Sequence, residues 1–269
     1  MYPLLNIDKK SQVDLLLRCA NAYLQLPPKL KAQAKGLHKL RQTTRHLLSL
    51  LPIEGYAQAR IKKVIQASNK IRDLDVLLWD VLPHLPDELR VLEAQVQPRL
   101  IAIRCGMDDE FKNDLQLELL PEITSCLVAY PHVLQAEFSL VSQLKRPQIS
   151  DLEKQFQKAK KQLVLLDIEN TQVHKLRLKI KRIRYQVGHF FPEQTEFLMR
   201  LRSLQDQLGE FHDYDQADKM MCKYSDLDEL MLVKVRKFLA ARQQNILAQV
   251  RRKLAAEKTA LSGFCLAEG

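Results

Sequence analysis

The sequence is poor in glycine and in aromatic residues. Only 7 of its 269 residues are glycine, and Phe, Trp and Tyr together make up 6%. So few glycines disfavour a Rossmann or P-loop site, which needs a glycine-rich turn around phosphate. So few aromatics leave no row on which unstacked bases could stack, as binders of single strands require. Because HExxH and GxSxG motifs are also missing, we expect a protein that is not an enzyme and needs no cofactor.

Cysteine usage and hydropathy exclude further classes. The five cysteines are scattered, odd in number and without a CxxC pair, which is ordinary for a reducing compartment. No apolar run approaches the roughly 20 residues that a membrane span needs. The first residues also lack the order of a signal peptide, in which basic residues are followed by an apolar stretch and then by small residues. These features predict a soluble cytoplasmic protein with no membrane partner.

Positive charge and helix-forming residues are what the chain has in excess. Lys and Arg number 42 against 32 Asp and Glu, and the formal net charge is +10 at pH 7. Apolar periodicity predicts helices throughout and no strand, so the expected fold class is all-α. In detail, we expect one helix over residues 56–82, a helix end at Gly106, and a final helix from Asp226 or Asp228 to near Lys258.

The most informative stretch is residues 173–185, VHKLRLKIKRIRY. On a helix at 100° per residue, an apolar face and a basic stripe lie side by side. The apolar face consists of Val173, Leu176, Ile180, Ile183 and Val187. The basic stripe consists of His174, Arg177, Lys181 and Arg184, with Lys175 in a second basic row on the far side. Because nothing acidic interrupts the stripe, its favourable partner is a polyanion.

The same pattern occurs in residues 37–51, LHKLRQTTRHLLSLL. Its apolar face is Leu37, Leu40, Thr44, Leu47 and Leu51. A second motif is duplicated as well, since RDLD at residues 72–75 aligns with HDYD at residues 212–215. The HKLR copies are offset by 136 residues and the second motif by 140. Two motifs in the same order at nearly equal offsets predict an internal repeat, with halves of about 1–147 and 148–269.

These motifs resemble the CHAD family, the conserved-histidine α-helical domain. The resemblance covers nearly the whole chain and suggests a stand-alone CHAD domain over residues 1–269. It implies two pseudo-symmetric helical bundles with a basic surface between them, and binding of inorganic polyphosphate on that surface. It also implies association with polyphosphate granules, as in bacterial members. No triphosphate-processing β-barrel is recognisable beside the domain, so we expect no hydrolase activity.

The residues expected to bind phosphate come from the HKLR helices and the helices that follow them. They are His38, Lys39, Arg41, Arg45, Arg60, Lys62, His174, Lys175, Arg177, Lys181, Arg184, Arg200 and Arg202. Arg offers planar bidentate donors to phosphate, and Lys offers a mobile point charge. We expect Asp73 and Asp213 to hold neighbouring arginines in orientation. Without tight ligand spacing, no metal is expected.

Several alternatives stay open at this point. The same cations would suit a nucleic-acid-binding protein that contacts the phosphate backbone, or a helical module that docks an acidic protein. His38 and His174 could be core histidines bonded to backbone carbonyls. The first HKLR copy has Leu48 where the second has Arg184, so the N-terminal half is expected to bind less tightly.

Overall fold

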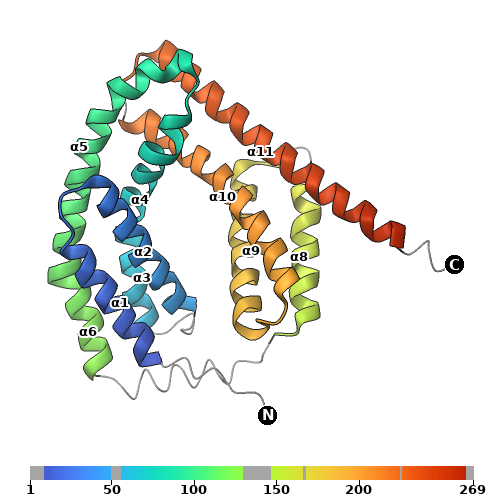
Figure 1. Ribbon diagram of the computed structural model, residues 1–269, viewed down its shortest axis with the longest axis horizontal. Coiled ribbons are helices and arrows are strands. Elements are labelled where there is room, and N and C mark those ends of the chain that lie inside the picture. The colour runs from blue at the N-terminus through green and yellow to red at the C-terminus, as the bar shows by residue number, and fades with distance from the viewer. Residues whose placement is uncertain (1–8, 50–55, 130–146, 166–167, 225, 265–269) are drawn as a thin grey trace. The chain divides into compact units, whose positions relative to one another are not determined.

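The computed structural model describes residues 9–49, 56–129, 147–165, 168–224 and 226–264, and the regular structure in these ranges is helical (Figure 1). The predicted all-α class is therefore confirmed. No helix in these ranges combines the length and the apolar character needed to cross a bilayer. The chain divides into two compact units, Met1–Pro83 with Glu93–Lys145 and His84–Leu92 with Arg146–Gly269. Pseudo-symmetry between the units, and a basic surface between them, stay predictions.

The first unit is organised around its second helix. Its helices are α1 (Lys9–Leu24), α2 (Leu30–Ser49), α3 (Tyr56–Ala67), α4 (Asn69–Val76), most of α5 (Arg90–Asp114), and α6 (Leu120–Ala129). α2 packs against α1, α3 and α4, and α3 packs against α6. The apolar face predicted for α2 is buried from Leu37 to Leu47, while Leu51 lies outside the described residues. This packing fixes the rotation of α2 about its own axis, so the direction in which its basic residues lie is fixed as well.

The single helix predicted over residues 56–82 is interrupted. α3 ends at Ala67 and α4 begins at Asn69, with Ser68 between them at φ −90° and ψ 1°. The buried Ser68 hydroxyl donates a hydrogen bond to the carbonyl of Val64 at 2.6 Å. Serine competes in this way with the backbone hydrogen bonds of a helix. Sequence periodicity missed the break because the apolar spacing is kept on both sides of it.

Two π-helical turns, and the helix that continues through Gly106, also differ from what the sequence predicts. π-helical turns at Leu77–Val81 and Leu115–Leu119 each end two residues before a proline, Pro83 and Pro121. A proline ring has no N–H and clashes with the carbonyl four residues earlier, and a wider turn relieves that clash. The helix end predicted at Gly106 is wrong, because α5 continues to Asp114. Glycine weakens a helix interior without being able to stop it.

The second unit contains four long helices that are consecutive in sequence. They are α8 (Ile149–Leu163), α9 (Asn170–Phe190), α10 (Thr195–Tyr224) and α11 (Glu229–Phe264). α9 packs against both α8 and α10, and α10 packs against α11. The apolar face predicted for α9 is fully buried, from Val173 to Val187. Burial of that face leaves the adjacent basic stripe along the edge of α9.

The ends of α11 and α8 are stabilised by side chains. The Asp228 carboxylate accepts a hydrogen bond from the backbone N–H of Met231 at 2.9 Å, which confirms Asp228 as one of the two predicted caps. α11 continues to Phe264, beyond the predicted end near Lys258. From α11, Arg251 Nη2 donates to the carbonyl of Leu165 at 2.7 Å, just past the end of α8. This satisfies a carbonyl that the helix itself cannot pair.

Candidate functional site

The second copies of the two motifs meet along the edge shared by α9 and α10. His174 of α9 and His212 of α10 face each other with their Nδ1 atoms 3.3 Å apart. Further along α9, Arg184 Nε donates a hydrogen bond to Gln205 Oε1 of α10 at 2.7 Å. Moving forward along α9 thus corresponds to moving backward along α10, so the helices run antiparallel here. The tertiary structure brings HKLR and HDYD together in one row, which we call the α9 edge: His174, Arg177, Lys181, Arg184 and His212.

Both histidines of the α9 edge have a lowered affinity for protons. Burial, with help from nearby Arg177 and from His174, lowers the pKa of His212 to about 4. Burial and Arg177 also lower the pKa of His174. Both rings are therefore mainly neutral at pH 7. A contact between two Nδ1 atoms then requires one ring to donate its N–H and the other to accept.

The cations of the α9 edge are held by packing. Arg177, Lys181 and Arg184 are half-buried and follow one another at intervals of about one helical turn. The ring of Tyr185 lies beside two of them, with its centroid 5.9 Å from Lys181 Nζ and 4.6 Å from Arg184 Cζ. Such cation–π contacts restrict the side chains before any ligand arrives, which lowers the entropy lost on binding.

The last acidic residue of HDYD is paired within the protein. Asp215 accepts hydrogen bonds from Lys219 Nζ at 2.6 Å and from Asn170 Nδ2 at 3.3 Å. Burial opposes ionisation, but these partners lower the pKa of Asp215. The carboxylate is therefore charged at neutral pH and ties the start of α9 to α10. The other acidic residue of the motif, Asp213, is half-buried.

The first HKLR copy is arranged differently from the second. Arg41 is 3% exposed, and its guanidinium is used within the protein. Its Nη1 donates to the carbonyl of Ile65 at 2.9 Å and to Ser68 Oγ at 2.6 Å, and its Nη2 donates to Asn69 Oδ1 at 2.8 Å. Burial, reinforced by Arg45, lowers the pKa of Arg41 to about 9, so it is charged at neutral pH. Arg41 thus holds the junction of α3 and α4.

The remaining residues of the first copy are more accessible. His38 is exposed and Arg45 is half-buried. Partial burial, with the charges of Arg72 and Arg45, lowers the pKa of His38. Helix α4, which contains RDLD, packs against α2. Arg72 Nη2 also lies 3.6 Å from Asp80 Oδ2. HKLR and RDLD therefore come together in the first unit too, and Asp73, the second residue of RDLD, is half-buried.

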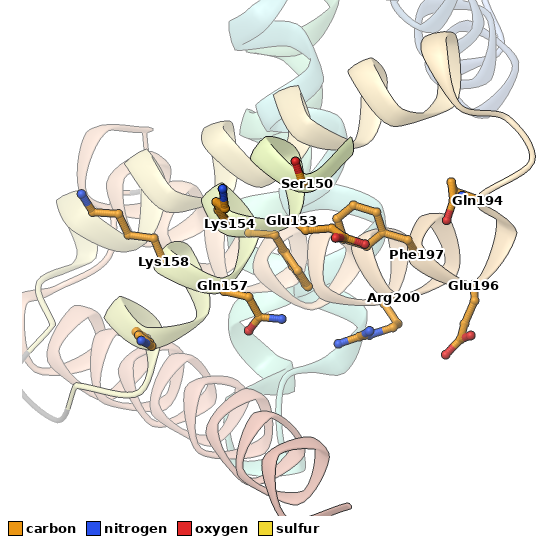
Figure 2. Close-up of a pocket in the computed structure, with 11 residues that line it drawn as sticks. Ser150, Glu153, Lys154, Gln157, Lys158, Gln194, Glu196, Phe197 and Arg200 are labelled. Atoms are coloured by element: carbon orange, nitrogen blue, oxygen red, sulfur yellow. The ribbon is translucent and has the colours of Figure 1, made fainter. Parts of the chain in front are cut away.

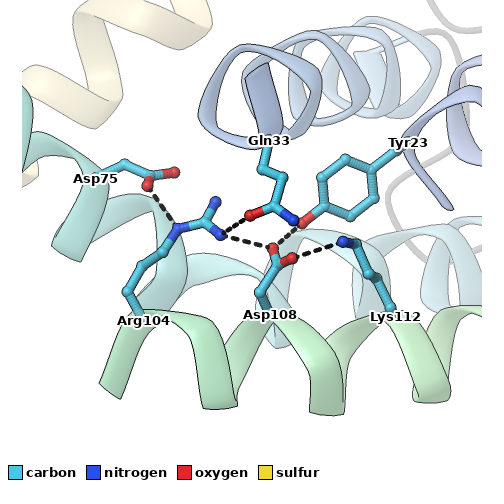
Figure 3. A network of polar contacts seen from close by, with 6 residues as sticks. All are labelled: Tyr23, Gln33, Asp75, Arg104, Asp108 and Lys112. Carbon is cyan, nitrogen blue, oxygen red and sulfur yellow. Dashed lines mark hydrogen bonds and ion pairs between the residues drawn. The ribbon is translucent and has the colours of Figure 1, made fainter. Parts of the chain in front are cut away.

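Asp75, the last residue of RDLD, belongs to a buried polar network (Figure 3). The members are Tyr23, Gln33, Asp75, Arg104, Asp108 and Lys112. Arg104 Nε donates to Asp75 Oδ1 at 2.9 Å, and its Nη1 lies 3.2 Å from Asp108 Oδ1. Burial alone would lower the pKa of Arg104, but the hydrogen bond and charge of Asp75 raise it. The Asp75 side chain is 0% exposed, whereas that of Asp215 in the second copy is 19% exposed.

Two predicted ligands point to other partners. Arg60 Nη1 lies 3.2 Å from the Glu122 carboxylate of α6. Arg200 Cζ lies 6.0 Å from the ring centroid of Phe156 and lines an open pocket of about 830 Å³ beside α8 (Figure 2). On α10, Arg200 is about 120° around the helix axis from His212 at 100° per residue. The structure therefore separates Arg200 from the α9 edge. The other predicted cations, Lys39, Lys62, Lys175 and Arg202, are exposed.

Sequence reasoning missed several residues that the structure places at these motifs. His212 and Arg72 occupy the first position of the second motif in each copy, so the repeat itself contained the signal for them. Tyr185 and Lys219 had no such signal, because their contacts depend on rotamers and on the pairing of helices. Within the described residues, no group of three His, Cys, Asp or Glu side chains is placed to hold a metal ion.

These features define an all-α domain in which a basic helix and a following acidic motif are paired in each unit. Residues 14–221 match the model of the CHAD domain, and the chain belongs to the CHAD family. The fold is similar to the crystal structure of the CHAD domain from the plant Ricinus communis, with a TM-score of 0.65 and 19% sequence identity. That similarity covers 92% of this chain and 89% of the plant chain. A comparison with curated proteins found no match.

Proposed function

We propose that this protein binds inorganic polyphosphate without chemically changing it, through the α9 edge. The observation that supports this most is the α9 edge itself, where three cations and two histidines from separate motifs line one pair of helices. Polyphosphate carries about one negative charge per phosphate and offers oxygens with no bases to read. A row of donors spaced by helical turns of about 5.4 Å suits such a chain.

Membership of the CHAD family adds weight to the proposal, because the family is linked to polyphosphate binding. In our proposal, His38, Lys39 and Arg45 of the first unit contribute further contacts. Arg41 acts indirectly, because its guanidinium is already bound to the α3–α4 junction. We propose peripheral roles for Arg60, Lys62, Lys175, Arg200 and Arg202. Asp73 and Asp213 would orient neighbouring arginines, and the two units together would form one domain of residues 1–269 in the cytoplasm, at polyphosphate granules.

Titration calorimetry with long-chain polyphosphate at two salt concentrations tests the function. Some six phosphate contacts predict a log–log salt slope of about −4, borrowing the value of about −0.7 per contact for single strands. A DNA oligomer and sulfate serve as comparisons. Tight binding of polyphosphate with weak binding of DNA supports the proposal. Equal binding of both polymers would point to a general polyanion or nucleic-acid binder, and no binding of either would favour an acidic protein partner.

Binding should be coupled to proton uptake by the histidine pair. Negative charge beside His212 favours its protonated form, which raises a pKa that the protein holds at about 4. We therefore expect affinity to rise as the pH falls from about 6.5 toward 4. Without ligand, the free energy of unfolding should fall over the same pH window, because His212 binds a proton more readily in the unfolded chain than in the folded protein. Calorimetry at pH 6 in buffers of different ionisation enthalpy measures the uptake.

The matched variants for this experiment are His212→Gln and His46→Gln. His46 is an exposed histidine of α2, so its replacement controls for the loss of an imidazole elsewhere. Proton uptake should shrink in the His212 variant and persist in the His46 variant. An uptake of zero in the unmodified protein, or equal uptake in both variants, would contradict a role for the pair.

A further inference from the structure

Gly209 lies in the interior of α10 without a packing reason to be glycine. A Cβ atom added there would meet no atom within 4 Å apart from its chain neighbours and the adjoining backbone of α10 itself. None of the described glycines has positive φ, so an ordinary residue could adopt the backbone conformation of Gly209. Glycine is also the least favourable ordinary residue in a helix interior, because it loses the most conformational freedom. The fold alone therefore does not explain this residue.

The place of Gly209 is defined by its two neighbours on the same face of α10. Gln205 is one turn before it and accepts the hydrogen bond from Arg184, and His212 is one turn after it and contacts His174. Because the two helices are antiparallel along this edge, Gly209 lies beside the middle of the α9 edge. The cations of that middle part are Arg177 and Lys181.

The first unit has a side chain at the corresponding position. With the offset of 140 residues between RDLD and HDYD, Gly209 corresponds to Asn69, and Arg177 corresponds to Arg41 through the HKLR alignment. Asn69 Oδ1 accepts a hydrogen bond from Arg41, which is 3% exposed. Gly209 has no side chain that could accept from Arg177, and Arg177 is half-buried rather than buried. The same place in the repeat is thus filled in the first unit and open in the second.

We propose that Gly209 determines access to the polyanion site: its missing side chain leaves the space in which a phosphate group lies against Arg177 and Lys181. The inference rests on the proposed function and specifies where on the α9 edge the ligand is bound most closely. Any side chain at residue 209 would occupy that space. An asparagine would in addition supply an acceptor for Arg177, as Asn69 does for Arg41.

The test compares Gly209→Ala and Gly209→Leu with Gly106→Ala and Gly106→Leu. Gly106 is a matched control, since it lies inside α5 and a Cβ atom there also meets nothing within 4 Å. Both alanine variants should raise the melting temperature by about 2–4 °C, the effect of removing one helical glycine from a protein of this size. Only the Gly209 variants should bind long-chain polyphosphate more weakly, with Gly209→Leu losing about tenfold, as for one lost hydrogen bond to a charged group.

The outcomes separate the inference from the function. If the unmodified protein binds no polyphosphate, the proposed function fails and the inference fails with it. If it binds, and Gly209→Leu binds equally well, the inference alone is overturned. If Gly106→Leu loses as much affinity as Gly209→Leu, the loss is not local to the α9 edge, and the inference is again wrong. A more stable Gly209 variant with weaker binding is the result that supports it.

Discussion

Replacing Arg177 and Lys181 together with glutamine is expected to weaken polyphosphate binding by about a hundredfold or more. Each side chain would lose one hydrogen bond between opposite charges, worth about 1.5–3 kcal/mol, and every 1.4 kcal/mol changes affinity tenfold. Glutamine keeps part of each aliphatic stem, which packs at the edge of the buried face of α9. The salt slope should also become shallower by about 1.4, for two fewer phosphate contacts. Calorimetry at two salt concentrations measures both quantities.

A control variant must separate the effect of lowering the net charge from the effect of removing these two particular side chains. Lys234 and Lys237 are exposed on α11, in the same unit, and their replacement with glutamine removes the same two charges. This control should keep its affinity within a few-fold, because surface charges away from the ligand act only through a screened field. Equal losses in the two double variants would mean that overall charge governs binding, and the α9 edge would then not be the site.

The second large effect is on stability, because Asp75→Ala should lower the free energy of unfolding by about 3–5 kcal/mol. Asp75 and Arg104 are both 0% exposed, and the substitution leaves the guanidinium without the carboxylate that its Nε contacts at 2.9 Å. The other carboxylate near Arg104, that of Asp108, is shared with Lys112, so loss of Asp75 leaves one buried positive charge uncompensated, which is costly. The loss is a large part of the 5–15 kcal/mol typical of a folded domain. Urea unfolding measures it.

Asp215→Ala is the matched variant, since Asp215 holds the same place in the second copy of the motif. Its ion pair with Lys219 is partly exposed, with side-chain exposures of 19% and 63%. Pairs in contact with solvent contribute about 0–1 kcal/mol, so the loss should be small. Similar losses for the two variants would contradict the conclusion that only the first copy is built into a buried network. The loss for Asp75→Asn, which keeps the shape of the side chain and removes its charge, should lie between the losses for the two alanine variants.

The two copies have similar motifs in different surroundings. In the first unit, Arg41 and Asp75 are bound inside the protein, by the α3–α4 junction and by Arg104. In the second unit, α10 continues without a break through the residues aligned with that junction. No pattern within HKLR or RDLD distinguishes these two outcomes. They depend on Ser68 and Arg104, which lie outside both motifs.

The sequence by itself determined the helical class, the duplicated motifs and the rotation of the basic helices. Local spacing was enough for these, because an apolar face that recurs every 3.6 residues must be buried whichever partners it meets. The faces predicted for α2 and α9 are accordingly buried, from Leu37 to Leu47 and from Val173 to Val187. Family membership followed from the order and spacing of the motifs, and the match over residues 14–221 bears it out.

Only the tertiary structure decided which cations lie together and which are taken up by the protein. The contact of His174 with His212 joins residues 38 positions apart, and Arg41 reaches across to Ser68 and Asn69. Arg60 and Arg200 look like the other cations in sequence, yet they face Glu122 and Phe156. The physical reason is that a side chain's environment depends on which helices pack beside it. Charge patterns along one helix contain no information about that pairing.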